Sequence, residues 1–304
     1  MTLGLDRLKK NKAQCIISLL LAGVVIIIAY YKGPSLFENL KQAKINWILA
    51  GLAFYLINYI IRAFRFKTIS RQHLRIWPDT VRSVSLHGFA TYMLPFRTGD
   101  LTLPIILKTI SQISPTEGGR ILLKARLLDI STLGFWTLLA SIISSINISY
   151  SIRAVWFITG VGMCLSPVAI KNLCKLGSKK ETWILRRIAT VRNVVQFSRL
   201  ELLESLGVWA AIGISFYCVV RAVGLPLGVG DVWLLITIQL PLQFIPIQGF
   251  ANAGNHESGW MAGLMILGVS ASEALKFALA SHAILLSYVL MLGFVALLVQ
   301  KKSK

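Results

Sequence analysis

The stretch LPFRTGDL, residues 94–101, interrupts an otherwise apolar region that runs from 81 to 110. Proline and glycine break helices, and two charged residues, Arg97 and Asp100, stand among them. Each arm beside the break has only about 10–15 residues, which covers roughly 15–23 Å as a helix. The hydrocarbon core of a bilayer is about 30 Å thick, so neither arm crosses it alone. The stretch therefore predicts a re-entrant helical hairpin, which enters and leaves the membrane on one side.

A second apolar region, 232–267, is interrupted in the same way. The segment PIQG at 246–249 and the polar run NAGNHE at 252–257 divide it into two short arms. Exposed backbone at membrane depth is tolerated only where it is buried in protein or lines a wet cavity. The sequence therefore predicts a second re-entrant hairpin, with its turn facing other protein or water.

The composition places the whole chain in a membrane. Of 304 residues, 55% are hydrophobic and 14% are charged. Soluble domains carry about 25% charged residues, and disordered chains carry far fewer apolar ones. The net charge of +20 is interpreted as basic residues that face anionic lipid headgroups at the cytoplasmic surface, with no nucleic-acid partner. None of the four cysteines lies in a C-x-x-C pair, so no metal site or disulfide framework is expected.

Six further apolar runs are predicted to cross the bilayer as helices. They are 15–31, 45–64, 127–148, 154–170, 206–223 and 274–299. The first run follows a basic segment, as in a signal peptide, but no A-x-A-like cleavage site follows it, so an uncleaved helix is expected. The predicted fold is an all-α integral membrane protein with six transmembrane helices and two re-entrant hairpins. It forms one domain over 1–304, with halves of about 1–150 and 151–304.

The distribution of basic residues predicts the orientation. With a cytoplasmic N-terminus and two hairpins, most of the 32 Lys and Arg residues fall on the cytoplasmic side, where Arg62, Arg65, Lys124 and Arg126 are also counted. Positive charge favours the cytoplasmic side of a membrane protein. Lys124 is expected to extend its amine to the inner headgroups. We therefore expect a multi-pass protein of the cell (inner) membrane with both termini cytoplasmic.

The two interrupted regions resemble each other. In both, a proline, a glycine and an acid are followed by a short apolar arm and then an S-x-x-E capping pattern, SPTE at 114–117 and SASE at 270–273. Three predicted crossings separate the hairpins, so the hairpins would enter from opposite faces. Such inverted repeats place a substrate site near the midplane of many transporters. The alternative is two unrelated proline and glycine kinks.

Four ionisable residues at the breaks are candidate site residues: Arg97, Asp100, His256 and Glu257. An ionisable group at mid-bilayer costs at least about 2.5–3.5 kcal/mol, so it faces a partner or water. If the two tips meet around a polar cavity, Arg97 would contact a phosphate. Glu257 would accept hydrogen bonds from hydroxyl or ammonium groups, or cycle a proton. The simpler alternative is that Arg97 pairs with Asp100 and only holds its turn.

A third pair, Arg126 and Asp129, lies three residues apart on one helix face. It forms either a buried ion pair or part of the same cavity. The chain has no H-E-x-x-H, G-x-S-x-G or P-loop motif, and no nucleophile accompanies the acids. We therefore expect no enzymatic activity and no cofactor.

Three of these segments carry a family resemblance. LPFRTGDL at 94–101 resembles the L-P-x-R-x-G-E-L turn of flippase-like proteins, which are relatives of the transmembrane region of lysylphosphatidylglycerol synthase. ARLLD at 125–129 resembles the E-R-x-x-D segment of that family, and residues 246–257 with LGV at 267–269 resemble its P-x-x-G-G-x-G-x-x-E…G-V stretch. Asp100 replaces the usual Glu, and a basic residue often found just after it is absent. The aminoacyl-transferase domain of some relatives is also missing, so lipid aminoacylation is not expected.

The resemblance implies translocation of a lipid or lipid-linked headgroup between leaflets. The expected substrate is a phospholipid or a polyprenyl-linked lipid, and a homo-oligomer is possible. Two other functions stay open at this point. One is a transporter of a small anionic metabolite, and the other is a membrane enzyme or accessory subunit in lipid-linked glycan synthesis.

Overall fold

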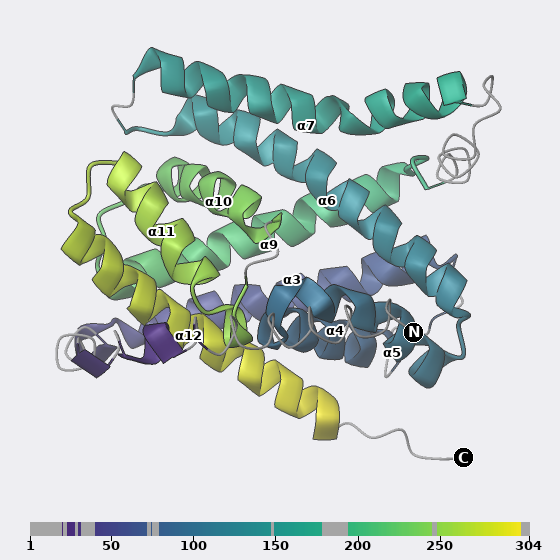
Figure 1. Cartoon of the computed structure of the whole chain (residues 1–304), viewed down its shortest axis with the longest axis horizontal. Helices are drawn as coiled ribbons and strands as arrows, with labels where there is room; N and C mark the ends of the chain where they lie inside the picture. The colour runs from purple at the N-terminus through teal and green to yellow at the C-terminus, as the bar shows by residue number, and fades with distance from the viewer. Residues whose placement is uncertain are drawn as a thin grey trace, which may run out of the picture.

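The computed structural model describes residues 20, 23–27, 30–31, 40–71, 74, 79–146, 149–177, 194–244 and 248–298, and their regular structure is helical (Figure 1). The helices are α3 (Ile45–Ile69), α4 (Val81–Met93), α5 (Thr102–Ser111), α6 (Pro115–Ile143), α7 (Tyr150–Gly177), α9 (Arg199–Val223), α10 (Val229–Phe244), α11 (Asn255–Ile266) and α12 (Ala271–Leu298). Two 3-10 segments, η2 (Pro95–Leu101) and η3 (Phe250–Asn252), lie between the short helices.

Within the described ranges, five helices are long and apolar enough to cross a membrane: α3, α6, residues 150–172 of α7, α9 and α12. They correspond to five of the six predicted crossings, and the remaining run, 15–31, lies mostly outside the described residues. The chain is thus a multi-pass membrane protein. α6 begins at Pro115, directly after the predicted capping serine, so the helix extends about three turns beyond the N-terminal end of the predicted crossing at 127.

Lys124 lies in the part of α6 that precedes the predicted crossing. Its amine forms an ion pair with Glu201 of α9 at 2.6 Å, and the residue is only 8% exposed. The prediction that Lys124 extends to the headgroups was wrong. The energetic reason is that a buried ammonium needs a carboxylate partner, and α9 supplies one at this depth.

The two predicted interruptions are present where the sequence places them. The first lies between α4, with 13 residues, and α5, with 10. The second lies between α10, with 16 residues, and α11, with 12. All four helices are shorter than the roughly 20 residues that a crossing helix needs.

The capping patterns form as predicted at the helices that follow the breaks. The Ser114 hydroxyl accepts a hydrogen bond from the Glu117 N–H at 3.3 Å and begins α6. The Ser270 hydroxyl accepts from the Glu273 N–H at 3.3 Å and begins α12. These bonds satisfy N–H groups that a helix start otherwise leaves free, so the sequence itself sets where both helices begin.

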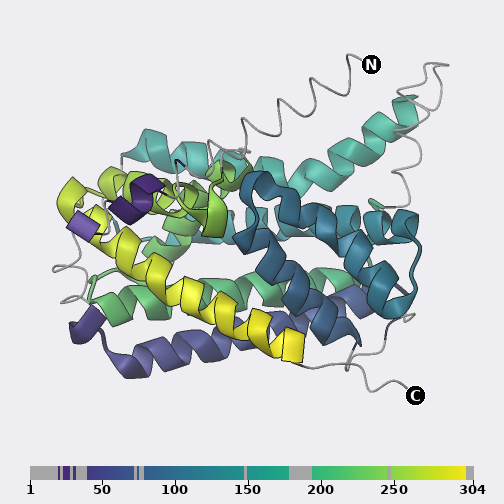
Figure 2. The ribbon, with the colours of Figure 1, turned by 60° about the horizontal axis from the view of Figure 1, so that its bottom comes forward.

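The helix contacts follow a two-fold pattern (Figures 1 and 2). α6 packs against α5 and α10, and α12 packs against the corresponding α11 and α4. α3 touches α4, α9 touches α10, and α3 and α9 pack along each other. Each contact of α3, α4, α5 and α6 thus has a counterpart among α9, α10, α11 and α12. α7 packs along α6 at the edge of the bundle (Figure 1).

Aromatic packing fixes the short helices of the second half. The rings of Trp136 on α6 and Trp233 on α10 stack at 4.5 Å between centroids. Trp233 also lies on Gly213 of α9, where any larger residue would overlap the indole ring. Trp260 of α11 is 1% exposed and packs against Phe277 of α12. These contacts hold α10 and α11 at a defined depth beside α6, α9 and α12.

Candidate functional site

The two breaks touch each other through Gln248. The backbone N–H of Phe96 donates to the carbonyl oxygen of Gln248 at 3.0 Å. The side-chain amide of Gln248 donates to the carbonyl oxygens of Thr91 and Tyr92, each at 3.2 Å, near the end of α4. One residue of the second break therefore satisfies backbone groups that the first break leaves without helical partners.

Both breaks contain non-glycine residues in the left-handed region of backbone space. Phe96 has φ 55°, Ala251 has φ 54° and Asn252 has φ 62°. A residue with a Cβ pays roughly 1–2 kcal/mol for this conformation. Hydrogen bonds offset the cost: Phe96 bonds to Gln248, and the carbonyl oxygen of Ala251 accepts from Nε2 of His282 at 2.8 Å. The shape of each break thus depends on distant parts of the chain.

An ion-pair cluster lies beside the first break. Asp100 pairs with Arg126 of α6, and Nη1 of Arg126 lies 3.5 Å from Oδ2 of Asp129. Oδ1 of Asp129 accepts from Nη1 of Arg65 at 2.6 Å and from Nε1 of Trp209 at 3.3 Å. The cluster joins η2, α3, α6 and α9.

A second acid–base cluster lies beside the second break. Glu257 pairs with Nδ1 of His282, and its other carboxylate oxygen accepts from the Gly254 N–H at 2.8 Å. Nε2 of His256 lies 3.0 Å from Oγ of Ser281, and the rings of His256 and His282 are 4.8 Å apart. Glu257 and His256 are 6% and 1% exposed, so this cluster is enclosed by protein.

The two clusters occupy equivalent places in the two halves. Asp100 and Arg126 are 26 residues apart, and Glu257 and His282 are 25 apart. Counted from the capping serines, Ser114 and Ser270, Arg126 and His282 stand at the same position of α6 and α12.

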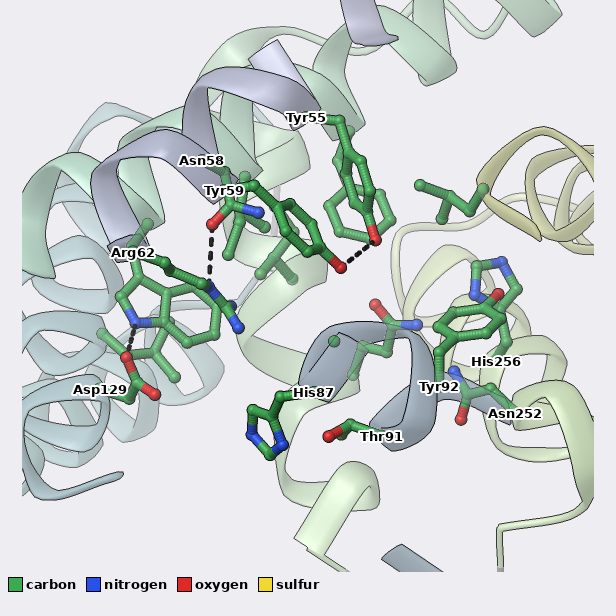
Figure 3. Close-up of a pocket in the computed structure, with 18 of the residues that line it drawn as sticks. Tyr55, Asn58, Tyr59, Arg62, His87, Thr91, Tyr92, Asp129, Asn252 and His256 are labelled. Atoms are coloured by element: carbon green, nitrogen blue, oxygen red, sulfur yellow. Dashed lines mark hydrogen bonds between the residues drawn. The ribbon is translucent and has the colours of Figure 1, made fainter. Parts of the chain in front are cut away.

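A cavity of about 200 Å³ lies between the clusters (Figure 3). The first half contributes the polar residues Asn58 and Arg62 from α3, His87 from α4, and Arg126 and Asp129 from α6. One water occupies about 30 Å³ in the liquid, so the cavity has room for a polar group of several heavy atoms.

The second half lines the same cavity with Gln239, Gln248, Asn252 and His256. Figure 3 shows Asn252, His256 and Tyr92 on one side of the space and Arg62, Asn58 and Asp129 on the other. The polar wall is therefore built by both halves of the chain.

Comparison with known proteins identifies the family of the chain. The family model described as the lysylphosphatidylglycerol synthase TM region matches residues 15–293. The chain belongs to this family. The resemblance inferred from the motifs at 94–101, 125–129 and 246–269 is thereby confirmed. No curated protein and no solved structure is significantly similar to the chain.

In this member of the lysylphosphatidylglycerol synthase TM family, the predicted site residues divide into two groups. Arg126, Asp129 and His256 line the cavity. Asp100 and Glu257 are the ion-pair partners of Arg126 and His282. The side chain of the sixth predicted residue, Arg97, lies outside the described part of the structure. Asp100 forms an ion pair with Arg126, and the expected pair of Arg97 with Asp100 falls on a side chain outside the described residues.

Sequence reasoning missed Arg62 and Arg65. Both were counted only as charges of the cytoplasmic side and not as site residues, but α3 continues to Ile69 and both arginines belong to it. Arg65 is 1% exposed, and Arg62 lines the cavity. The signal that favours this position is their spacing, because arginines three apart on a helix share one face. Gln239 and Gln248 had no such signal.

Proposed function

We propose that this chain moves a lipid or lipid-linked headgroup between the leaflets of the cell membrane through the cavity between the two breaks. The observation that carries the proposal is the position of this cavity, whose wall has polar side chains from both halves of a multi-pass protein. Membership of a family named for the membrane region of a lipid-modifying protein supports a lipid substrate. The proposal includes no chemical change to the headgroup.

The proposed layout has six crossings, two re-entrant hairpins and cytoplasmic termini, with the halves related as an inverted repeat. Three observations support it: the short arms, the two-fold pattern of helix contacts, and the equivalent pairs Asp100–Arg126 and Glu257–His282. In such a layout the hairpins enter from opposite faces and their tips meet near the midplane.

The cavity would lower the main barrier to translocation, which is desolvation of the headgroup. An isolated ionised group costs tens of kcal/mol in a medium of dielectric constant about 4. Arginine and amide groups of the cavity would replace the lost water, while the lipid chains stay in the bilayer. Exposure to one side and then the other requires the breaks to move. The bonds that Gln248 makes to Thr91 and Tyr92 are positioned to open and close in that movement.

A reconstitution experiment tests the proposal. Purified protein is placed in vesicles that contain phosphatidylglycerol with a fluorophore on one acyl chain, and dithionite removes the fluorescence of the outer leaflet. We expect wild-type protein to transfer lipid from the inner leaflet faster than protein-free vesicles, and Arg126→Gln to slow the transfer at least about tenfold, because a charged hydrogen-bond partner is lost. Arg221→Gln is the matched control, since Arg221 lies over the ring of Trp47, outside the cavity.

The other outcomes are decisive as well. Wild-type transfer no faster than that of protein-free vesicles would refute lipid translocation. Uptake of glycerol 3-phosphate into sealed vesicles, without lipid transfer, would assign the cavity to a small anionic metabolite instead. A change in headgroup mass after incubation would contradict the absence of chemistry.

A further inference from the structure

The charges around the cavity do not balance. Among the described side chains that line the cavity, and the ion partners of those side chains, the arginines are Arg62, Arg65 and Arg126, and the carboxylates are Asp100 and Asp129. Asp129 forms ion pairs with Arg65 and Arg126, and Asp100 forms an ion pair with Arg126. Arg62 is left as a cation in excess.

Arg62 is also the least occupied of the three arginines. Its Nε donates to Oδ1 of Asn58 at 3.0 Å, and within the described residues its guanidinium makes no ion pair (Figure 3). The guanidinium group has five N–H donors, so four stay available to a ligand in the cavity. Their planar arrangement matches the oxygens of a phosphate.

Gln239 is a second cavity residue whose hydrogen-bonding groups are available to a ligand. It lines the cavity and is 3% exposed, and its side-chain amide has no hydrogen-bond partner among the described residues. The amide of Gln239 is open to the cavity and has both donors and an acceptor, so it is available to hydrogen-bond the hydroxyl groups of a ligand. Asn58 also lines the cavity. Its amide oxygen accepts from Arg62, and its amide nitrogen has no partner among the described residues, so the nitrogen can donate to a ligand hydroxyl.

Among the described side chains of its wall, the cavity offers no free carboxylate. Asp129 accepts from Arg65 and Trp209, and Asp100 is held by Arg126. Beyond the cavity wall, Glu257 is paired with His282 and also accepts from the Gly254 N–H. An ammonium group entering this space would meet an excess arginine and no unpaired carboxylate.

From this inventory we infer that the cavity binds a phosphodiester whose headgroup carries neutral hydroxyls, such as a glycerol or sugar unit, and discriminates against headgroups that carry an ammonium. Arg62 contacts the phosphate, and Gln239 and Asn58 contact the hydroxyls. The inference rests on the proposed function for its lipid source, but the binding chemistry stands by itself. A soluble glycerol phosphate presents the same groups, so the experiment separates the two sources.

Equilibrium binding in detergent micelles tests the site independently of transport. The probes are phosphatidylglycerol, phosphatidic acid and phosphatidylethanolamine with identical acyl chains, and soluble glycerol 3-phosphate. The readout is fluorescence of Trp209, which lines the cavity, recorded against a Trp209→Phe blank. We expect phosphatidylglycerol to bind at least about tenfold more tightly than phosphatidylethanolamine, since the latter brings an ammonium to an excess cation.

Two variants assign the two contacts. Arg62→Gln weakens phosphatidylglycerol and phosphatidic acid alike, by about tenfold or more, because both use the phosphate contact. Gln239→Leu weakens phosphatidylglycerol but leaves phosphatidic acid unchanged, because phosphatidic acid has no headgroup hydroxyl. Arg221→Gln, which removes a positive charge outside the cavity, leaves all affinities unchanged. The preserved phosphatidic acid affinity of Gln239→Leu also demonstrates that this variant is folded.

The outcomes separate the inference from the proposed function. Equal affinity for phosphatidylglycerol and phosphatidylethanolamine overturns the inference, even if every lipid is translocated. Selective binding without vesicle transfer supports the site and overturns translocation. Tight binding of glycerol 3-phosphate with no binding of phosphatidylglycerol overturns the lipid source and leaves a soluble phosphate site. An Arg62→Gln variant that binds phosphatidylglycerol as wild type removes the assigned phosphate contact.

Discussion

His282 lies in α12 at the position that Arg126 occupies in α6, and each pairs with the acid of its own break. The two halves therefore use one arrangement with different chemistry. In the first half the base is a guanidinium, which stays charged, and the partner is Asp100. In the second half the base is an imidazole, which can be neutral or charged, and the partner is Glu257.

Double-mutant cycles should detect this arrangement. We expect Asp100→Asn and Arg126→Gln each to lower the free energy of unfolding, and the double variant to lose less than the sum, with a coupling energy of about 0.5–3 kcal/mol. The free energy is measured by unfolding in mixed micelles titrated with a denaturing detergent. The cross cycle of Asp100→Asn with His282→Asn serves as control and should be additive within about 0.5 kcal/mol. Equal coupling in both cycles would show that the pairs are not independent units.

Labelling of single cysteines should reveal the inverted arrangement. Thr116 and Ser272 are exposed and stand two residues after the capping serines of α6 and α12. In a background without the four native cysteines, we expect a membrane-impermeant maleimide in intact cells to label Ser272→Cys. Thr116→Cys should be labelled only after the membrane is opened, because the first hairpin returns to the cytoplasmic side. Labelling of both variants from the same side would contradict the inverted repeat.

Substitutions at Gln248 should separate the contact between the breaks from overall stability. Gln248→Ala removes two hydrogen bonds, which are worth about 0.5–1.5 kcal/mol each, and we expect slower lipid transfer. Gln248→Glu should be slower still, because a carboxylate facing the carbonyl oxygens of Thr91 and Tyr92 repels them. Gln196→Ala, at an exposed position, is the matched control. Transfer by Gln248→Glu at the wild-type rate would show that this contact plays no part in transport.

Two glycines provide a matched pair for the geometry of the first break. A Cβ at Gly99 would overlap the carbonyl group of Ala90, whereas a Cβ at Gly119 has open space around it. We expect Gly99→Ala to displace η2 from α4 and to slow lipid transfer. Gly119→Ala should keep the rate and raise stability by up to about 1 kcal/mol, because alanine favours a helix. Melting temperatures in detergent and transfer rates in vesicles measure the two effects. Equal behaviour of both variants would contradict the close packing of the break.

Local patterns in the sequence were enough to predict several elements. The breaks at 94–101 and 246–257 follow from proline, glycine and arm length, and the starts of α6 and α12 follow from Ser114 and Ser270. These features depend on neighbours within a few residues. Five of the predicted crossings follow from hydrophobic runs in the same way.

Local patterns could not predict which residues of different helices form ion pairs. Arg126 and Asp129 pair as their spacing predicts, but Asp129 forms a shorter ion pair with Arg65, 64 residues away, which no local pattern indicates. Arg62 and Arg65 stand at the end of the predicted crossing 45–64 and were counted only as charges of one membrane side, yet α3 continues past both. Helix periodicity says which residues share a face of one helix, and it does not say which helix packs on that face.

The sequence by itself determined the membrane class, the places where two apolar segments break and the helix starts beyond them, since hydrophobicity, proline, glycine and capping act locally. The tertiary structure decided that the breaks touch through Gln248 and that Arg62 is the cation left over in the cavity. The physical reason is that hydrogen bonds and ion pairs between distant segments depend on helix packing, and packing is settled only when all the helices are assembled.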